Sequence, residues 1–179
     1  MSTLKDRMIR AAKLDVSLYE EVEQDKDSLR QATAVVVLAS VAAAIGSGHR
    51  MGIGGMIAGG VVSLIAWYVW AYLAYVIGTK LLPEPQTHAD VGQLLRTTGF
   101  SSSPGLIRIL GIIPGLTGIV FFVAWIWMLV TMVVAVRQAL DYSGTGRAVA
   151  VCVIGWLVQG LILALFFHLA ATPTSRVVL

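Results

Sequence analysis

The side chains that could do chemistry in the apolar part of this sequence are few and far apart. Arg108 and Gln159 are polar residues inside long apolar runs, whereas Asp and Glu are absent from residues 32–80 and 91–140. Proton relays and cation pathways through a membrane depend on such ionisable groups facing one another. The sequence therefore argues against a pump, a carrier or a small-solute channel.

Histidine and cysteine offer little more. His49 and His168 lie near the ends of two apolar runs, where they are either interfacial side chains or a metal or haem pair. The single cysteine, Cys152, cannot form a CxxC metal site and is interpreted as a packing residue. Because no nucleophile motif, phosphate loop or metalloprotease motif occurs, we expect no catalytic residues, no metal and no cofactor. The chain is predicted not to be an enzyme.

Composition places the chain in a membrane. Hydrophobic residues make up 57% of the 179 positions, charged residues only 13%, and the mean hydropathy is +0.81. Soluble domains carry about 25% charged residues. Residues 1–31 hold six of the 13 Lys and Arg residues and seven of the 10 Asp and Glu residues. The net charge of +3, without a basic cluster among aromatics, does not indicate nucleic-acid binding.

The charged head, residues 1–31, is predicted to contain two helices. Residues 3–14 form an amphipathic pattern that suits either a cytoplasmic helix lying in the membrane interface or a solvated lead-in. Asp15 is placed to cap a second helix. That helix carries a possible partner-docking surface, for which the alternative is an ordinary solvated face; its residues are Tyr19, Glu20, Glu21 and Glu23.

Five apolar segments are expected in residues 32–171, so the predicted fold is an all-α bundle of five transmembrane segments. Their ranges are 32–46, 54–79, 99–113, 116–136 and 148–171. Pro114 and Gly115 must break the run from Gly105 to Val136, because one helix of that length would exceed the hydrocarbon core. The third segment is short and either crosses or dips in and returns. Residues 172–179 form a short tail.

Small and polar residues suggest how the segments pack. Gly55 and Gly59 form a GxxxG pair, which favours close helix contact, although flexibility at a helix entrance explains it equally well. Pro114 and Gly115 shape the break between segments. Gln159 is expected to make an interhelical hydrogen bond.

Basic residues indicate the orientation. If all five segments cross, one side holds ten Lys and Arg residues and the other holds Arg50 and Arg176. The positive-inside rule then places the N-terminus in the cytoplasm and the C-terminus outside. A lipid head-group site is a further hypothesis, with Arg96, Arg108 and Arg137 near one leaflet. For Arg108 the alternative is a side chain that snorkels to the interface.

Several short motifs resemble those of the Yip family of Ypt/Rab-interacting membrane proteins, in its bacterial branch. The likeness extends over about residues 11–171, and its motifs are 18–23 (LYEEVE) followed by Ala32, 99–104 (GFSSSP), 113–115 (IPG), 125–127 (WIW) and 136–140 (VRQAL). The resemblance implies a five-span helical bundle with a cytosolic N-terminus. Eukaryotic relatives act in vesicle traffic, bind small GTPases, shape membranes and assemble with one another.

The leading functional prediction is a non-enzymatic scaffold or accessory subunit in a bacterial cytoplasmic membrane. Its expected partners are membrane lipids and either other membrane proteins or further copies of the chain. The alternative is a lipid-binding or lipid-moving protein, with a small-solute channel or transporter as a third reading. The bacterial composition favours assembly or lipid-related roles, because no Rab partner would be available.

Overall fold

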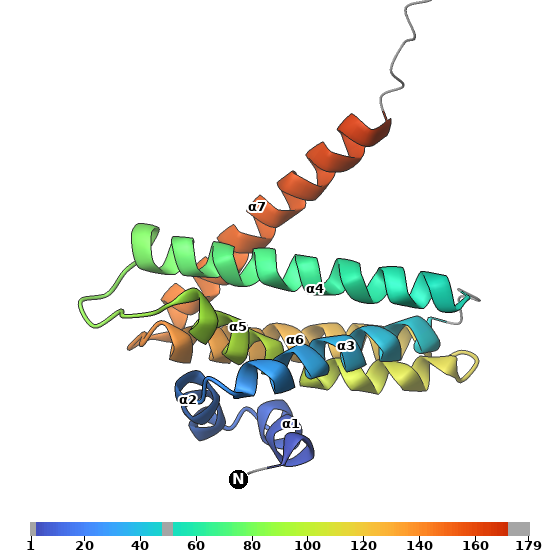
Figure 1. Ribbon diagram of the computed structural model, residues 1–179, viewed down its shortest axis with the longest axis horizontal. Coiled ribbons are helices and arrows are strands. Elements are labelled where there is room, and N and C mark those ends of the chain that lie inside the picture. The colour runs from blue at the N-terminus through green and yellow to red at the C-terminus, as the bar shows by residue number, and fades with distance from the viewer. Residues whose placement is uncertain (1–2, 48–51, 172–179) are drawn as a thin grey trace, which may run out of the picture.

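The computed structural model describes residues 3–47 and 52–171 and is helical throughout its main elements (Figure 1). Helices α1 (Leu4–Ala12) and α2 (Val16–Gln24) form the charged head. Asp15 caps α2 as its position predicts, since its side chain accepts a hydrogen bond of 3.0 Å from the Ser17 backbone N–H. Leu14 joins the two helices with a positive φ of 62°.

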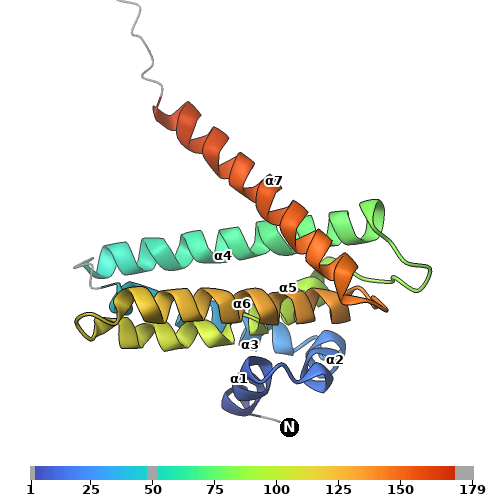
Figure 2. The ribbon, with the colours of Figure 1, turned by 180° about the vertical axis from the view of Figure 1, so that it is seen from behind.

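Two long antiparallel helices follow the head. Helix α3 covers Ser28–Gly46 and α4 covers Ile53–Val76, and a π-helical turn η1 (Ile77–Leu81) extends α4. The body is completed by α5 (Val91–Phe100), the 3₁₀-helix η2 (Ser103–Ile112), α6 (Thr117–Ala139) and α7 (Thr145–Ala171). Helix α3 packs against α4, and α6 packs against η2, α5 and α7, while α7 crosses α4 and then diverges from the bundle (Figures 1 and 2).

Four stretches are long and apolar enough to cross a membrane: Ser28–Gly46, Ile53–Leu81, Thr117–Ala139 and Thr145–Leu165. They correspond to the first, second, fourth and fifth predicted segments. The chain is thus an all-α protein with several membrane-spanning helices. The third predicted segment, 99–113, is not one helix, because α5 ends at Phe100 and η2 begins at Ser103.

The sequence explains this change of helix type. A capping box starts α5, in which the Gln93 N–H donates to Asp90 Oδ1 at 2.8 Å and the Asp90 N–H donates to Gln93 Oε1 at 2.6 Å. Pro104 cannot continue an α-helix, because it lacks an N–H and its ring meets the carbonyl four residues earlier. Ser101 and Ser103 instead donate to the nearby carbonyls of Thr98 and Phe100.

A seam of small residues holds the α5–η2 segment against α3. A Cβ added to Gly99 would lie 2.7 Å from Ala32 Cβ, one on Gly105 would lie 3.2 Å from Ala39 Cβ, and one on Gly111 would lie 2.6 Å from the Gly46 oxygen. Within η2, Gly105 and Gly111 lie six residues apart, which suits the three-residue turn of a 3₁₀-helix. Their partners on α3 recur every seven residues, as two α-helical turns require.

The seam also stays in register along its length. From Ala32 to Gly46, α3 rises about 21 Å at 1.5 Å per residue. From Gly99 to Gly111 the chain rises about 22 Å, because η2 climbs about 2.0 Å per residue. An α-helix over the same residues would rise only about 18 Å. The 3₁₀ geometry therefore lets a short segment run beside α3 as far as Gly46.

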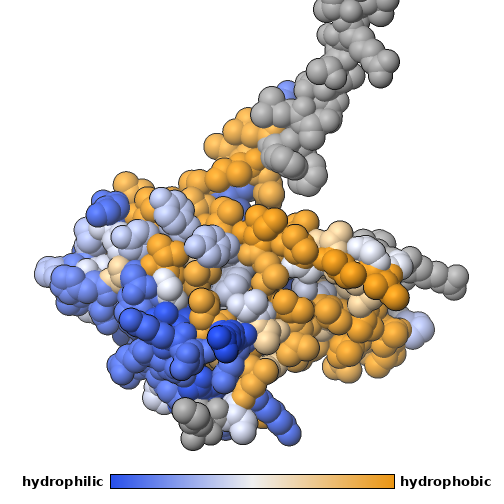
Figure 3. Space-filling model, in the orientation of Figure 1, coloured by the Kyte–Doolittle hydropathy of each residue, from blue (hydrophilic) through white to orange (hydrophobic). Residues whose placement is uncertain are grey.

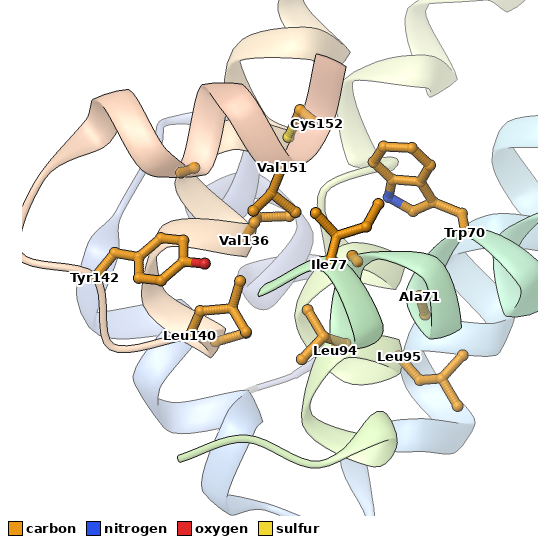
Figure 4. Close-up of a cluster of buried hydrophobic side chains, with 13 residues drawn as sticks. Trp70, Ala71, Ile77, Leu94, Leu95, Val136, Leu140, Tyr142, Val151 and Cys152 are labelled. Carbon is orange, nitrogen blue, oxygen red and sulfur yellow. The ribbon is translucent and has the colours of Figure 1, made fainter. Parts of the chain in front are cut away.

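Two buried clusters form the core. The first joins α4, η1, α5, α6 and α7 around large apolar residues, and Tyr142 closes it by donating to the Leu82 carbonyl at 2.9 Å (Figure 4). The second places Leu18, Tyr19 and Val22 of α2 against Ala32 and Phe100. The head is therefore packed against the body as part of one core.

The surface separates by polarity. Hydrophilic side chains gather on the head and on the loops at the same end of the bundle, while hydrophobic side chains cover α4, α7 and the opposite end (Figure 3). Ile53, Ile57 and Leu157 are among the most exposed apolar residues, at 80%, 62% and 70%. Such a surface suits lipid, because water would penalise it.

Candidate functional site

The most distinctive site is a partly open cavity of about 290 Å³ between the helices of the bundle. Its walls come from α3, α4, η2, α6 and α7, and its polar lining residues are Ser40, Ser63, Ser102, Arg108 and Gln159. Trp67, Trp70 and Trp156 form an aromatic wall, in which the rings of Trp70 and Trp156 stack with centroids 5.7 Å apart. Polar groups therefore converge in an otherwise apolar part of the molecule.

Arg108 is positioned by the glycine seam. Its carbonyl lies directly against Gly46, so the backbone of η2 is fixed at the end of α3. Its side chain reaches α6, where Nη2 lies 2.8 Å from the sulfur of Met128, and its guanidinium carbon lies 5.8 Å from the centre of the Phe121 ring. Nε is buried and has no hydrogen-bond partner among the described residues. The guanidinium is thus held between helices.

Gln159 of α7 also lines the cavity. Its Nε2 donates to the carbonyl of Ala66 at 3.3 Å, which is an interhelical hydrogen bond between α7 and α4. Beyond Ala66 and Gln159 the cavity adjoins a groove of about 310 Å³ between α4 and α7, lined otherwise by Val62, Ile65, Val69, Ile162 and Leu163. The polar cavity and the apolar groove share a boundary.

A second polar centre ties the head together. Arg7, 6% exposed, donates from Nη2 to Glu21 and Asp25, both at 2.8 Å, and from Nη1 to Gln31 at 3.0 Å. One guanidinium thus connects α1, α2, the turn after α2 and α3. Hydrogen bonds from Arg10 and Ser17 lower the pKa of Asp15 to about 2, so this carboxylate is ionised at neutral pH.

Arg96 fastens the head to the body. It is 7% exposed, and its guanidinium donates to the backbone carbonyls of Val22 (2.9 Å) and Glu23 at the end of α2. The interaction satisfies carbonyls that the last turn of a helix leaves open and places a cation where the helix dipole is negative. Trp127 adds a contact from α6, because its Nε1 donates to the Ala12 carbonyl at 2.8 Å.

Glu23 lies at the junction between α2 and α5. Its Oε1 accepts a hydrogen bond of 2.9 Å from Gln93. Burial, together with the charges of Asp141, Glu20 and Asp90, raises the pKa of Glu23 to about 7, although Arg96 opposes the shift. This carboxyl group therefore changes charge near neutral pH at the contact between head and body.

The three arginines of the predicted head-group site have different neighbours. Arg96 binds the end of α2 and Arg108 faces the central cavity, whereas Arg137 donates to the carbonyls of Tyr142 and Ser143 in the loop before α7. Of these three arginines, Arg108 is the one that lines the central cavity. A lipid role for the other two remains a prediction.

The residues of the predicted docking surface contact other parts of the same chain. Tyr19 is fully buried, and Glu21 binds Arg7 and Arg10. Glu20 accepts a hydrogen bond from Gln138 at 3.2 Å, and Glu23 accepts one from Gln93. The structure thus places this surface at the junction of head and body, and its docking role remains a prediction.

The predicted packing residues differ in their surroundings. Gly115 forms the turn between η2 and α6 with a φ of 85°, which explains why a glycine follows Pro114. Gly59 is exposed, and a Cβ added there would meet no atom within 4 Å. A packing role for Gly55 and Gly59 stays a prediction, whereas close contacts between helices occur at the seam glycines, which were not predicted. Their spacing of six residues was the available signal.

Metal chemistry finds no support among the residues that the structure describes, where no group of three or more His, Cys, Asp or Glu side chains comes together. Cys152 is buried in the first core cluster. His168 is exposed, and His49 lies outside the described residues.

Comparison with known proteins identifies a family. The family model of the Yip1 domain matches residues 17–167, which covers α2 from its second residue, the following helices of the body and most of α7. Neither the search of curated proteins nor the search of solved structures found a match.

Proposed function

Because this chain belongs to the Yip1 domain family, we propose that it acts as a non-enzymatic scaffold or accessory subunit that assembles with other membrane-protein helices. The family match and the apolar helices establish a multi-pass membrane protein. The assembly role is the further step, and one feature of α4 carries it.

That feature is the open first half of α4, where Gly54 and Gly59 lie on different sides of the helix and Ile53 and Ile57 are exposed. A Cβ on either glycine would meet no atom within 4 Å, in contrast to Gly46, Gly99 and the other seam glycines. Glycine in a helix costs about 1 kcal/mol relative to alanine. Small residues offset that cost when they let another helix approach closely in lipid. Because no described atom lies within 4 Å of a Cβ placed at Gly54 or Gly59, this half of α4 has room for another helix, and we propose a second protein helix as its occupant.

The arrangement of α7 supports the same role. Its first turns pack against Trp70 and α6, while Leu157, Leu161 and Leu165 are exposed along the diverging half (Figure 2). A helix that leaves the bundle offers a second apolar face next to α4. We include in the proposal a cytoplasmic N-terminus, because ten Lys and Arg residues fall on that side if α5–η2 makes a fifth crossing. We also include a bacterial membrane, which the composition favours.

The test is affinity purification of the full chain from native membranes in mild detergent, followed by intact-mass analysis. We expect a stoichiometric protein partner or a homo-oligomer that Gly59→Leu disrupts, since a bulky side chain would block close approach. Gly118→Leu on α6 is the matched control, because its Cβ would also meet no atom within 4 Å. A wild-type chain that purifies alone as a monomer, or complexes that tolerate Gly59→Leu, would contradict the proposal.

Lipid binding is the second candidate function, and the cavity around Arg108 favours it. A cation held between helices with an unpartnered Nε is costly in a membrane unless an anion is near. Arg108 combines this need with a polar cavity and an adjoining apolar groove.

A further inference from the structure

The charge of Arg108 is uncompensated within the described part of the chain. Its closest polar neighbour is a thioether sulfur, and its other contact is an aromatic ring. No ion pair to Arg108 occurs among the described residues, and the sequence has no Asp or Glu from residue 91 to 140. Taking a cation out of water without a counter-charge costs several kcal/mol, whereas a bound anion would recover much of it. The arginine therefore points to an anionic ligand.

The cavity has the size and chemistry for such a ligand. At about 290 Å³ it is many times larger than one water molecule needs. The hydroxyl groups of Ser63 and Ser102 and the second amide proton of Gln159 are hydrogen-bond donors in the same lining as Arg108, whereas the Ser40 hydroxyl already donates to the Val37 carbonyl at 2.8 Å. Arginine is also the side chain whose fork of donors best matches phosphate oxygens. A phosphate group fits this set.

The neighbouring groove indicates what is attached to the anion. The two spaces share Ala66 and Gln159, and the remaining walls of the groove are aliphatic residues of α4 and α7. A small hydrophilic anion would gain nothing from that groove, whereas a hydrocarbon chain would bury apolar surface there. The groove is open to the surrounding lipid, because its walls Val62, Ile162 and Leu163 are 63%, 45% and 46% exposed.

We propose that this pair of spaces is a binding site for an anionic phospholipid. The phosphate lies beside Arg108 among the serine hydroxyls, and one acyl chain lies in the groove between α4 and α7. This inference rests on the second candidate function and gives it a site and a ligand class. Of the three arginines, it assigns head-group recognition to Arg108 alone.

The experiment measures lipid retention by the full chain in mild detergent by native mass spectrometry. The chain is mixed with phosphatidylglycerol, phosphatidylcholine or oleate at equal concentration. We expect phosphatidylglycerol to be retained at least tenfold more than phosphatidylcholine. Arg108→Gln should abolish that preference, and Arg108→Lys should restore part of it, because lysine keeps the charge without the fork of donors. Arg137→Gln is the charge-matched control, because Arg137 binds the loop before α7, and this variant should retain the lipid.

A second pair of variants tests the groove without touching the charge. Leu163→Trp should fill the groove and lower retention severalfold, whereas Leu161→Trp, on the exposed face of the same helix, should not. Thermal unfolding of each variant identifies any variant that fails to fold. If Arg108→Gln fails to fold, Leu163→Trp and Leu161→Trp still test the groove.

The possible outcomes distinguish a wrong binding site from a wrong function. Selective retention by the wild-type chain that neither Arg108→Gln nor Leu163→Trp reduces would refute the site and leave lipid binding intact. Equal retention of phosphatidylglycerol and phosphatidylcholine, or no retention of either, would refute lipid recognition itself. Preference for oleate over phosphatidylglycerol would overturn the phosphate assignment and make a carboxylate the ligand.

Discussion

The contact between Gly46 and Arg108 yields the sharpest prediction about the fold. A Cβ at Gly46 would lie 1.7 Å from the Arg108 carbonyl oxygen and 2.7 Å from its carbon. The shortest ordinary carbon–oxygen contact is about 3.3 Å, so Gly46→Ala must separate α3 and η2 by about 1.6 Å. Backbone atoms stand on both sides, so no side-chain rotation relieves the clash.

The magnitude follows from that geometry. Overpacking usually costs about 1–3 kcal/mol, and a clash between backbones belongs at the upper end. For a chain of this size about 3 kcal/mol corresponds to a fall in Tm of about 6–12 °C. The assay is thermal unfolding of the full-length chain in one detergent, followed by tryptophan fluorescence and size-exclusion chromatography.

Alanine substitutions at two further glycines should lower Tm less than Gly46→Ala does. At Gly105 the nearest atoms to a new Cβ are Met128 Sδ at 3.1 Å and Ala39 Cβ at 3.2 Å, so Gly105→Ala should lower Tm by much less. Gly118→Ala meets open space and should leave Tm unchanged or slightly raised. If Gly46→Ala unfolds within about 2 °C of the wild-type chain, the seam does not hold α3 and η2 together as described.

Two further predictions concern the head. Arg7→Ala should destabilise it by about 1–2 kcal/mol, because its carboxylate partners are about a third exposed and water compensates part of the loss. Faster tryptic cleavage after Lys26 would show this, with the exposed Arg30→Ala as control and equal cleavage as the contrary result. For Glu23 the native pKa of about 7 exceeds the ordinary 4.5, so the native state retains a proton that the unfolded chain has lost. Stability from this group is therefore complete below about pH 4.5 and declines as pH rises through 7. The Tm advantage of Glu23→Gln over the wild-type chain should grow from pH 5 to 8; a constant difference would contradict the assignment.

Long apolar runs were the features that the sequence predicted best. The four spanning stretches follow from length and hydropathy alone, and Gly115 follows from the need to turn after Pro114. The stretch 99–113 was harder, because apolarity does not distinguish an α-helix from the longer 3₁₀-helix. Its triple serine and Pro104 mark where the α-helix must end, but the path beside α3 depends on contacts between distant residues.

The site could be predicted only in part for the same reason. Arg108 and Gln159 stand out as polar residues in apolar runs, yet no spacing shows that they face one cavity from η2 and α7. Likewise, the acidic residues of α2 look solvated in the sequence. In the structure Glu21 forms an ion pair with Arg7 of α1, and Glu23 accepts a hydrogen bond from Gln93 of α5. Local patterns identify candidates, and packing decides which of them meet.

The seam and the cavity depend on each other through the geometry of η2. Because η2 is stretched, Arg108 reaches the level of Gly46 while its side chain returns toward Met128 at the middle of α6. An α-helix over residues 99–111 would end about 4 Å short of Gly46. It would also rotate by about 100° per residue instead of about 120°, so residue 108 would point in a different direction. The 3₁₀-helix therefore keeps the seam in register and aims the one cation of the segment into the bundle. A substitution that makes η2 α-helical should weaken both the packing of η2 against α3 and the retention of lipid by the chain. Leu163→Trp should weaken lipid retention alone.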